Sequence, residues 1–239
     1  MLQLRQVRYT YPGWPPVVDG VDWAMAPGEI HCLVGRSGCG KTTLLKLAAG
    51  LMQPKAGMVL LAQQPVMTPH PDMGFVFQSP NLLAWLSVLD NVLLPITLHR
   101  AVQPEDEAHA HDLLARMGLS ALAQQRPPQL SGGQQSRVAI ARALVTRPLL
   151  LLMDEPFPRS TPSPAKNCKT ICWRCAKPRA ARCCLSPMTW PRRCTWLIGC
   201  RSWRKASCKA RYRLTCHGRA QQTCATPRAS TPCALSCAP

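Results

Sequence analysis

The sequence predicts an α/β fold built on a mostly parallel β-sheet, and three observations lead to this prediction. Apolar stretches of strand length alternate with stretches of helical spacing through residues 1–157. A glycine-rich segment, residues 35–43, stands between a predicted strand and a predicted helix. A short apolar run, residues 149–153, ends in two acidic residues. Strands that alternate with helices are typical of a parallel sheet covered by helices.

The charge of the chain divides at Phe157. Residues 1–157 carry 12 Lys and Arg residues, all 11 Asp and Glu residues and 2 of the 14 cysteines. Residues 158–239 carry the other 17 cations, no acidic residue and 12 cysteines. The net charge of +18 is therefore an average over two unlike segments, and for the first we expect no nucleic-acid partner.

The composition also bounds the class of protein. Hydrophobic residues make up 46% of the 239 residues, which is enough for a buried core in one domain or two small ones. No run of 18 apolar residues occurs, so we expect no transmembrane helix. The first residues, MLQLRQVRYTYPG, lack the apolar stretch of a secretory signal, and we expect a cytosolic start.

The predicted elements follow in chain order. Residues 2–23 alternate apolar and polar side chains around a Tyr-Pro-Gly turn, which predicts an antiparallel β region. Residues 29–34 predict a buried strand, and the helix after the glycine-rich segment ends near Gly50. Residues 74–77 predict a short strand. Helical spacing is found at residues 88–98, 105–117 and 137–145.

The glycine-rich segment fits the pattern G-x-x-x-x-G-K-[ST], in the strand-to-helix context which that pattern requires. Glycines let consecutive backbone N–H groups turn inward around an anion, and the helix N-terminus adds its dipole. Lys41 then supplies a charge to the β- and γ-phosphates of a nucleotide, and the Thr42 hydroxyl becomes a ligand of Mg²⁺. The predicted nucleotide-binding residues of this loop are Gly35, Arg36, Ser37, Gly38, Cys39, Gly40, Lys41, Thr42 and Thr43.

Two further motifs accompany this loop. The apolar run 149–153 delivers Asp154 and Glu155 at the carboxyl end of a strand, the edge at which ligands bind in open α/β sheets. Asp154 is a candidate Mg²⁺ ligand, and Glu155 is a candidate general base for an attacking water. The segment LSGGQ, residues 130–134, places Ser131 and two glycines before a helix, a second phosphate-binding helix terminus. An ordinary serine N-cap would account for Ser131 but not for both glycines.

These motifs together resemble the ATP-binding cassette (ABC) ATPases. The phosphate loop, FVFQSP around Gln78, LSGGQ and LLLLMDEP stand in the order and spacing of that family over residues 1–157. The resemblance implies a P-loop NTPase core of the RecA-like type, with an N-terminal antiparallel β region and a helical signature subdomain. The segment LLAWLSVLDNVLLPI after Gln78 is most similar to importers of nitrate, sulfonate or taurine.

The resemblance assigns further roles by position. Tyr11 would stack on adenine, the alternative being a strand aromatic in the core. Gln78 would contact Mg²⁺ and sense the γ-phosphate, the alternative being a solvated loop glutamine. Four residues would contact the γ-phosphate held by the opposite subunit: Ser131, Gly132, Gly133 and Gln134. The working unit would then be a head-to-tail dimer with two ATP molecules, peripheral at the cytoplasmic face of the membrane, joined to permease subunits and served by a substrate-binding protein.

Residues 158–239 depart from the family pattern. The family continues with an Ala-Leu-Asp loop and, some thirty residues on, a histidine that contacts the γ-phosphate; this chain has residues 158–160 and Met188 there. His217 comes too late to substitute. A zinc module at Cys172 and Cys175 lacks a second pair, and disulfides do not suit a cytosolic ATPase. A basic nucleic-acid tail does not explain a break within a motif.

A one-nucleotide shift of reading frame near codon 157 does explain the break. Residues 186–198, read one base back with permitted codons, become VTHDLAEAVYLADR, which contains a histidine segment of the family type. Residues 158–174 become ALDAVTREELQDDLLA, and residues 175–185 become LRKATGSTVLL. We therefore interpret residues 158–239 as an out-of-frame tail with no fold and no function of its own, beside an incomplete nucleotide-binding domain at residues 1–157.

The predicted function is that of an ATP-binding and ATP-hydrolysing importer subunit that couples hydrolysis to uptake of a small solute. The chain as printed is expected to be impaired in catalysis, because the histidine, the Ala-Leu-Asp loop and one core strand are lost. Two alternatives remain open from the sequence. One is a non-transport ABC ATPase that acts on nucleic acid or the ribosome, although such proteins usually carry two cassettes. The other is a nucleotide-binding remnant without turnover.

Overall fold

The structure is a computed structural model that describes residues 1–27, 29–34, 38–156, 181–185, 195–198 and 211–213. The chain combines strands and helices, as the sequence predicts, but they come in runs rather than in strict alternation. The strands are β1 (Leu2–Tyr9), β2 (Val18–Met25), β3 (Ile30–Val34), β4 (Ala56–Leu61), β5 (Gln64–Pro65), β6 (Met73–Val76), β7 (Leu150–Met153), β8 (Ala181–Leu185), β9 (Thr195–Ile198) and β10 (Arg211–Arg213). The helices are α1 (Lys41–Ala48), α2 (Val88–Thr97), α3 (Pro104–Arg116) and α4 (Gly132–Leu144), with short 3₁₀ turns at Ser120–Leu122 and Pro127–Gln129.

The N-terminal part forms a four-stranded antiparallel sheet in the order β2-β1-β4-β5. The antiparallel region predicted for residues 2–23 is therefore confirmed. A bulge interrupts β1 at Gln6, whose φ of 48° lies in the left-handed region. Gly57 of β4 packs against this bulge, and a Cβ there would come within 2.3 Å of the Gln6 carbonyl oxygen. The sequence analysis did not predict β4, whose first three residues are exposed.

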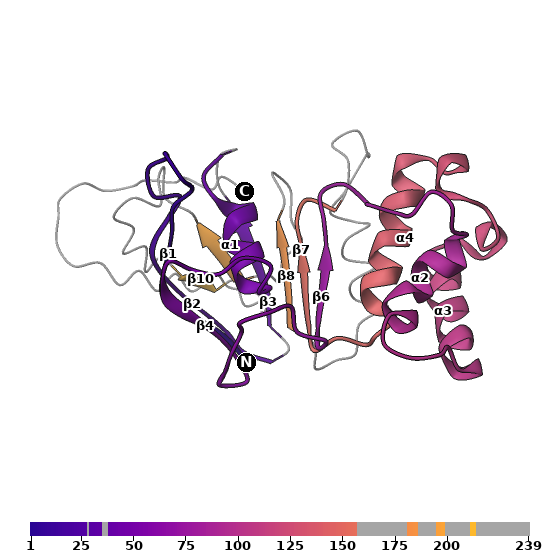
Figure 1. Ribbon diagram of the computed structural model, residues 1–239, viewed down its shortest axis with the longest axis horizontal. Coiled ribbons are helices and arrows are strands. Elements are labelled where there is room, and N and C mark those ends of the chain that lie inside the picture. Colours follow the sequence, from indigo (N-terminus) through magenta and orange to yellow (C-terminus); the bar gives the residue numbers. More distant parts are fainter. Residues whose placement is uncertain (28, 35–37, 157–180, 186–194, 199–210, 214–239) are drawn as a thin grey trace, which may run out of the picture.

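The main sheet has six strands in the order β10-β9-β3-β8-β7-β6. Its pairs are parallel except for β10 with β9. Figure 1 shows β6, β7 and β8 running between the part that contains α1 and the part that contains α2, α3 and α4. The carboxyl ends of β6 and β7 lie side by side, because Val76 pairs with Met153. This edge carries the acidic residues described below.

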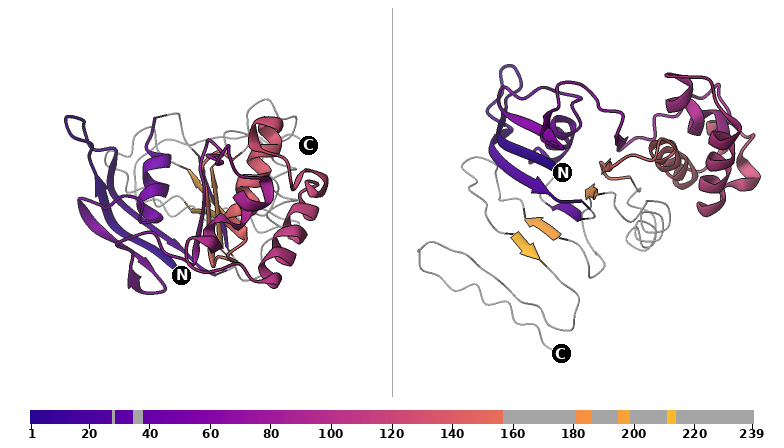
Figure 2. Two further views of the ribbon diagram at one scale, coloured as in Figure 1. Left: turned by 45° about the vertical axis from the view of Figure 1, so that its right-hand side comes forward. Right: turned by 90° about the horizontal axis from the view of Figure 1, so that it is seen from below.

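The three helices α2, α3 and α4 form a helical part at one end of the molecule (Figure 2). Local sequence explains where each helix begins. Ser87 and Ser131 cap α2 and α4 in capping boxes with Asp90 and Gln134, and α3 begins with a proline, which suits the first helical turn. The cap at Ser131 starts α4 five residues earlier than the apolar spacing from residue 137 predicts.

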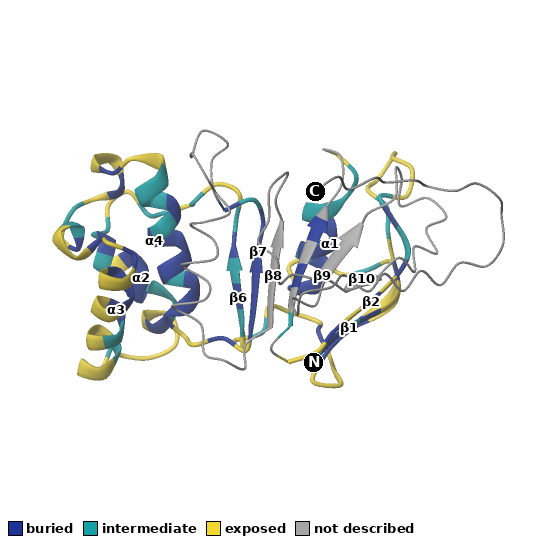
Figure 3. Cartoon of the chain, turned by 180° about the vertical axis from the view of Figure 1, so that it is seen from behind, coloured by how far each residue is buried: buried dark blue, intermediate teal, exposed yellow. Residues whose placement is uncertain are grey.

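Buried apolar residues form two clusters. One lies among α2, α3, α4 and the strands β6 and β7, and the other lies between the N-terminal sheet, β3, α1 and β7. All four residues of β7 are buried, and Figure 3 shows this strand in the colour of buried residues between the two parts. The strand that leads into Asp154 is therefore packed on both faces.

The structure differs from the sequence expectation within residues 158–239. The sequence predicts no fold there and a missing core strand, yet β8 pairs in parallel with both β3 and β7. The expectation of a missing strand is therefore wrong, and β9 and β10 are two further strands in this segment. A gap between β3 and β7 would leave two rows of backbone groups unpaired in the sheet, which is costly. The predicted substitutions at residues 158–160 and Met188, and the pair Cys172 and Cys175, lie outside the described residues.

Candidate nucleotide-binding site

The described part of the phosphate loop has the backbone of an anion cradle. Gly38 and Gly40 have φ values of 78° and 94°, the left-handed region in which glycine is favoured. Gly40 is the N-cap of α1, and its carbonyl oxygen accepts the hydrogen bond from Leu44 at 2.8 Å. Gly35, Arg36 and Ser37, which the sequence assigns to the same loop, lie outside the described residues.

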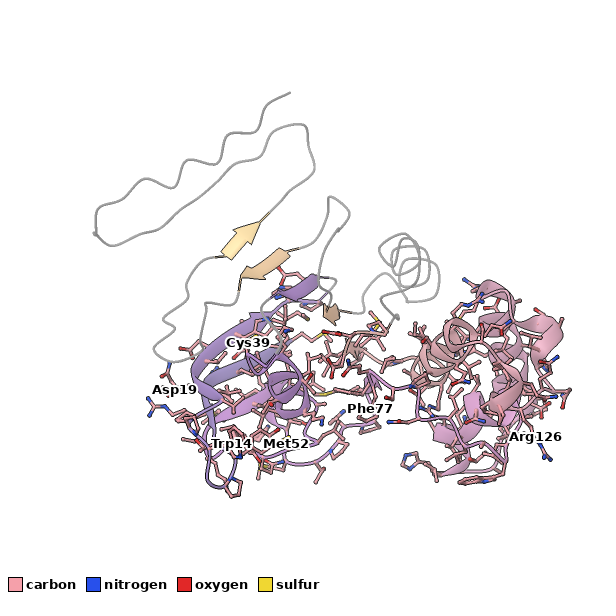
Figure 4. The ribbon with its side chains drawn as sticks, turned by 90° about the horizontal axis from the view of Figure 1, so that it is seen from above. Trp14, Asp19, Cys39, Met52, Phe77 and Arg126 are labelled. Atoms are coloured by element: carbon pink, nitrogen blue, oxygen red, sulfur yellow. The ribbon has the colours of Figure 1, made fainter. Side chains whose placement is uncertain are left out.

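Lys41 and Cys39 lie together at the start of α1. The Lys41 Nζ donates to the Cys39 Sγ at 3.7 Å, and both side chains are half-buried. The ammonium group therefore lies over the loop rather than out in solvent. Figure 4 shows Cys39 on the side of the molecule that carries the N-terminal sheet and α1.

A direct hydrogen bond joins the phosphate loop to the end of β7. The Thr42 Oγ1 donates to the Asp154 Oδ1 at 3.1 Å across 112 residues of sequence. Asp154 is 3% exposed, and its backbone N–H donates to the Val76 carbonyl at 2.8 Å. Burial raises the pKa of Asp154, an effect that the bond from Thr42 opposes. Two of the three residues that the sequence assigns to Mg²⁺ are thus in contact, the third being Gln78.

Glu155 and Gln78 stand at the carboxyl ends of neighbouring strands. Glu155 is half-buried and has a φ of 44°, a strained conformation for a residue with a Cβ, which turns the chain directly after Asp154. Gln78 is exposed and follows β6 by two residues. The pairing of Val76 with Met153 brings both residues to the edge of the sheet that carries Asp154.

Tyr11 approaches the same helix from the N-terminal sheet. Its hydroxyl is 3.2 Å from the Thr43 Oγ1, and its ring meets that of Tyr9 edge-on at a centroid distance of 5.0 Å. Tyr11 is 36% exposed, so its ring is open to solvent beside α1 and is not a core aromatic. Thr43 is buried at this contact.

The signature segment does not contact the other described site residues of this chain. Ser131 Oγ accepts from the Gln134 backbone N–H at 3.3 Å, and the Gln134 side chain accepts from the Ser131 N–H at 2.7 Å. Ser131 and Gly132 are exposed, and a Cβ at Gly132 or Gly133 would meet no atom within 4 Å. Figure 4 shows Arg126, five residues before Ser131, at the far end of the molecule from Cys39.

Arg142 is a residue that the sequence analysis missed. It lies on α4, and its two terminal nitrogens donate to the carbonyls of Pro80 and Asn81 at 2.7 and 2.8 Å. Burial lowers the pKa of the guanidinium. Its signal in the sequence was one cation within the apolar run VAIARALV. Arg142 connects the helix that begins at the signature segment to the loop that contains Gln78.

Comparison with known proteins agrees with this geometry. Residues 18–158 match the ABC transporter family. The chain belongs to the ABC transporter family. The matched region ends one residue beyond Phe157, at which the charge of the chain changes. No helix in the described part of the chain is long and apolar enough to cross a bilayer.

Individual members of the ABC transporter family are similar over the same region. The taurine import ATP-binding protein TauB of Pseudomonas fluorescens is 42% identical over 158 residues, which are 66% of this chain and 60% of that protein. The nitrate import ATP-binding protein NrtD of Synechococcus elongatus is 43% identical over 143 residues, which are 59% of this chain and 52% of that protein. The match therefore spans little more than half of these relatives.

A solved member of the ABC transporter family is similar over more of the chain. It is the ATP-binding cassette MJ0796 as a dimer in a post-hydrolysis state with ADP and Pi, with a TM-score of 0.71 and 28% identity. The alignment covers 82% of this chain and 94% of that one. The predicted α/β P-loop fold is thereby confirmed.

Proposed function

We propose that this chain is the ATP-binding subunit of an importer, in which ATP binding and hydrolysis drive uptake of a small solute through separate permease subunits. The observation that carries the proposal is the hydrogen bond between Thr42 and Asp154. It joins the phosphate loop to the acidic end of β7. Neither α1 nor β7 needs this bond for its own backbone hydrogen bonding. Membership of the ABC transporter family supports the same function.

The phosphate loop would hold the β- and γ-phosphates. The glycine backbone, together with the N-terminus of α1, offers N–H groups and the positive end of a helix dipole. Lys41 adds a full positive charge at the same place. Tyr11 stands beside α1 with an open ring, so that its face can stack on adenine while its hydroxyl stays on Thr43.

The contact of Thr42 with Asp154 fits a Mg²⁺ ion. Neighbouring ligands of an octahedral Mg²⁺ lie about 3 Å apart, and the two oxygens here are 3.1 Å apart. The hydroxyl would lose its bond to the carboxylate and both would turn to the metal, with Gln78 reaching the same ion from β6. When bound, the ion offsets negative charge on the phosphates. The positive charge of the ion would also compensate the desolvation of the Asp154 carboxylate, which raises the pKa of this residue.

Hydrolysis would use Glu155 and Gln78. Glu155 follows the metal ligand directly, and its left-handed backbone turns it away from the strand direction. A carboxylate at this place can accept a proton from a water that attacks the γ-phosphate. Gln78, at the end of the neighbouring strand, can orient that water and report the presence of the γ-phosphate to the loop that follows it.

A second subunit would complete each site. Ser131, Gly132, Gly133 and Gln134 offer an open helix N-terminus that has no contact with the phosphate loop among the described residues. An exposed N-terminus of this kind suits the γ-phosphate held by another copy in a head-to-tail dimer. The solved MJ0796 cassette, which is dimeric, supports this arrangement.

The loop between β6 and α2 is the proposed contact with the permease. Trp85 in this loop is 69% exposed, which is unusual for so large an apolar side chain outside an interface. The loop directly follows Gln78, so a change at the γ-phosphate can reach the partner. The subunit would then lie at the cytoplasmic face of the membrane. The relatives named for taurine and nitrate import support a small anionic or zwitterionic solute, selected by the permease and its binding protein.

The tail at residues 158–239 is proposed to be read out of frame. The register of β8 supports this, because Arg182 pairs with Ile30 on one side and Leu151 on the other, in the interior of a parallel sheet. Such strands are normally continuous apolar runs. The restored frame places Ser-Thr-Val-Leu-Leu over these five residues, which is a strand sequence. The chain as printed would bind nucleotide but turn it over poorly.

Nucleotide binding tests the proposal. The chain should bind MgATP, and Lys41→Ala should weaken binding at least a hundredfold, because a charge-assisted contact to the phosphates is lost. Lys55→Ala is the matched control, since Lys55 is exposed and lies on the loop before β4. Titration with a fluorescent ATP analogue measures both variants. Tight binding by folded Lys41→Ala protein would overturn the assignment of the phosphate loop.

A further inference from the structure

A pocket of about 380 Å³ lies in the helical part, away from the phosphate loop. It is lined by the end of α2, the first half of α3 and the turn from α4 into β7. Its polar side chains are His99, Arg100, Asp106, His109, Thr146 and Arg147. The nucleotide-binding function assigns no role to this pocket.

The pocket carries an excess of positive charge. Arg100 and Asp106 neutralise each other in a two-pronged ion pair at 2.5 and 2.8 Å, which lowers the pKa of Asp106 to about 2. The Arg147 backbone N–H donates to the Leu144 carbonyl at 2.9 Å, whereas its guanidinium makes no hydrogen bond or ion pair with any described residue. Arg147 is exposed and lines the pocket, and its backbone φ of 54° is a strained conformation directly before Pro148. One guanidinium is therefore left without an anionic partner.

His109 lines the same pocket and carries a buried polar atom. The Nε2 of His109 is buried and lacks a hydrogen-bond partner among the described residues. Burial, and next the charge of Arg147, lower the pKa of His109. Asp112 and Asp106 act in the opposite direction, and Arg116 adds to the effect of Arg147. A buried nitrogen without a partner costs free energy that a ligand with a matching polar atom removes.

We propose that this pocket binds a small oxyanion, which pairs with the guanidinium of Arg147 and accepts a hydrogen bond from the Nε2 of His109. Carboxylate, sulfonate, sulfate and phosphate groups share the required chemistry, because the planar guanidinium donates two parallel hydrogen bonds to two oxygens. The bound anion connects α3 to the turn that leads into β7. The proposal does not depend on ATP binding, since none of its residues belongs to the nucleotide site.

The histidine itself reports on this site. An anion beside His109 reverses the effect of Arg147, so sulfate should raise the pKa of His109 by about one pH unit relative to chloride at equal ionic strength. Imidazole NMR signals of the full chain, followed against pH, measure this. His109→Gln identifies the signal by its loss. His111, which is exposed on the same helix and outside the pocket, is the internal control and should not respond.

Substitution at Arg147 then tests the charge. Arg147→Gln should weaken sulfate binding about tenfold, since a charge-assisted pair is lost, whereas Arg5→Gln on β1 should leave it unchanged. Repeating the titration with acetate and with inorganic phosphate separates planar from tetrahedral oxyanions. Because His109 is observed directly, binding at the phosphate loop does not affect the result.

Three outcomes would overturn the proposal. They are an equal pKa of His109 in sulfate and chloride, an equal response of His111, and unchanged sulfate affinity in Arg147→Gln. If Arg147→Gln does not fold, Arg147→Lys keeps the positive charge but lacks the planar guanidinium, and it should bind sulfate with intermediate affinity. In that case the titration of the unaltered chain decides.

Discussion

Asp154 lowers the stability of the nucleotide-free protein and is suited to bind a cation. Its carboxylate is almost fully buried, and burial raises its pKa from the ordinary value of 3.8. The native state therefore holds a proton that the unfolded chain releases, and stability falls as pH rises from 3.8 through the raised value. Above that range the ionised group remains a cost until a cation or another donor compensates it.

Replacement of Asp154 by Asn should make the nucleotide-free chain more stable near pH 7. The amide oxygen can still accept from Thr42, while the buried charge is gone. The urea midpoint should rise, and its decrease with pH above 3.8 should flatten. Exposed Asp72→Asn is the control and should change neither. The same Asp154→Asn variant should lose Mg²⁺-dependent ATP binding, and unchanged binding would contradict the role of Asp154 as a metal ligand.

Asn91 fixes the loop that carries Trp85. The side chain is 0% exposed, accepts from the Leu83 N–H at 2.8 Å and donates to the carbonyls of Leu83, Leu86 and Ser87 at 2.9 to 3.3 Å. Asn91→Leu leaves these backbone groups without partners and should lower the free energy of unfolding by about 2–3 kcal/mol. Urea unfolding measures the loss. Exposed Gln124→Ala should cost less than about 0.5 kcal/mol, and an equal loss in both variants would contradict the role of Asn91.

At the scale of elements, α4 links two parts of the proposed site. Its N-terminus is the signature segment, and Arg142 near its other end holds the backbone of Pro80 and Asn81. A movement of the helix therefore moves the loop that begins at Gln78. Neither end of this link touches the phosphate loop within the described part of the chain. The helix is the element that connects the two segments.

Arg142→Leu should release the loop after β6. The carbonyls of Pro80 and Asn81 lose a charged donor, and amide exchange over residues 78–87 should become about tenfold faster or more. Arg142→Lys supplies one donor nitrogen in place of two, and its exchange rate should lie between those of the unaltered chain and Arg142→Leu. Hydrogen exchange with mass spectrometry measures the change. Arg126→Leu, an exposed site, is the control, and faster exchange there as well would indicate a general loss of stability.

At the scale of the whole molecule, the central sheet depends on a strand from the tail. β8 fills the position between β3 and β7 with a five-residue segment whose sequence, ARCCL, is unusual for an interior strand of a parallel sheet. The position is set by topology, because both neighbours need a partner. The chemistry beyond the strand is not set by topology, since Met188 stands where the family resemblance places a histidine that contacts the γ-phosphate.

A chain read one base back from codon 157 onward should therefore hydrolyse ATP about a hundredfold to a thousandfold faster than the chain as printed. The restored histidine supplies a transition-state contact, and the restored sequence places apolar residues in β8, next to the strand that leads to Asp154 and Glu155. Steady-state ATPase rates of the two chains, each checked for folding, measure the difference. Glu155→Gln in the restored chain should bind ATP without turnover. Comparable rates in the printed and restored chains would show that the out-of-frame interpretation is wrong.

The sequence by itself determined the elements and the chemistry of the site. Periodicity predicts the antiparallel start, the helices after residues 88 and 105, and the strand before Asp154, because these patterns record which faces are buried. The motif around Lys41 and the pair Asp154 and Glu155 predict phosphate and metal chemistry, since their residue types and spacing leave few alternatives. The strand β4 was missed, because three exposed residues precede its apolar half and break the alternation of apolar and polar residues.

Only the tertiary structure decided which of these residues meet. The hydrogen bond of Thr42 with Asp154 spans 112 residues of sequence, and that of Arg142 with Pro80 spans 62 residues. No local sequence pattern therefore contains either contact. β8 pairs with β3 and β7 although its local sequence does not favour a strand. Strand pairing and packing join residues that are distant in sequence, and for that reason burial, pKa and partnership emerge only when the chain is folded.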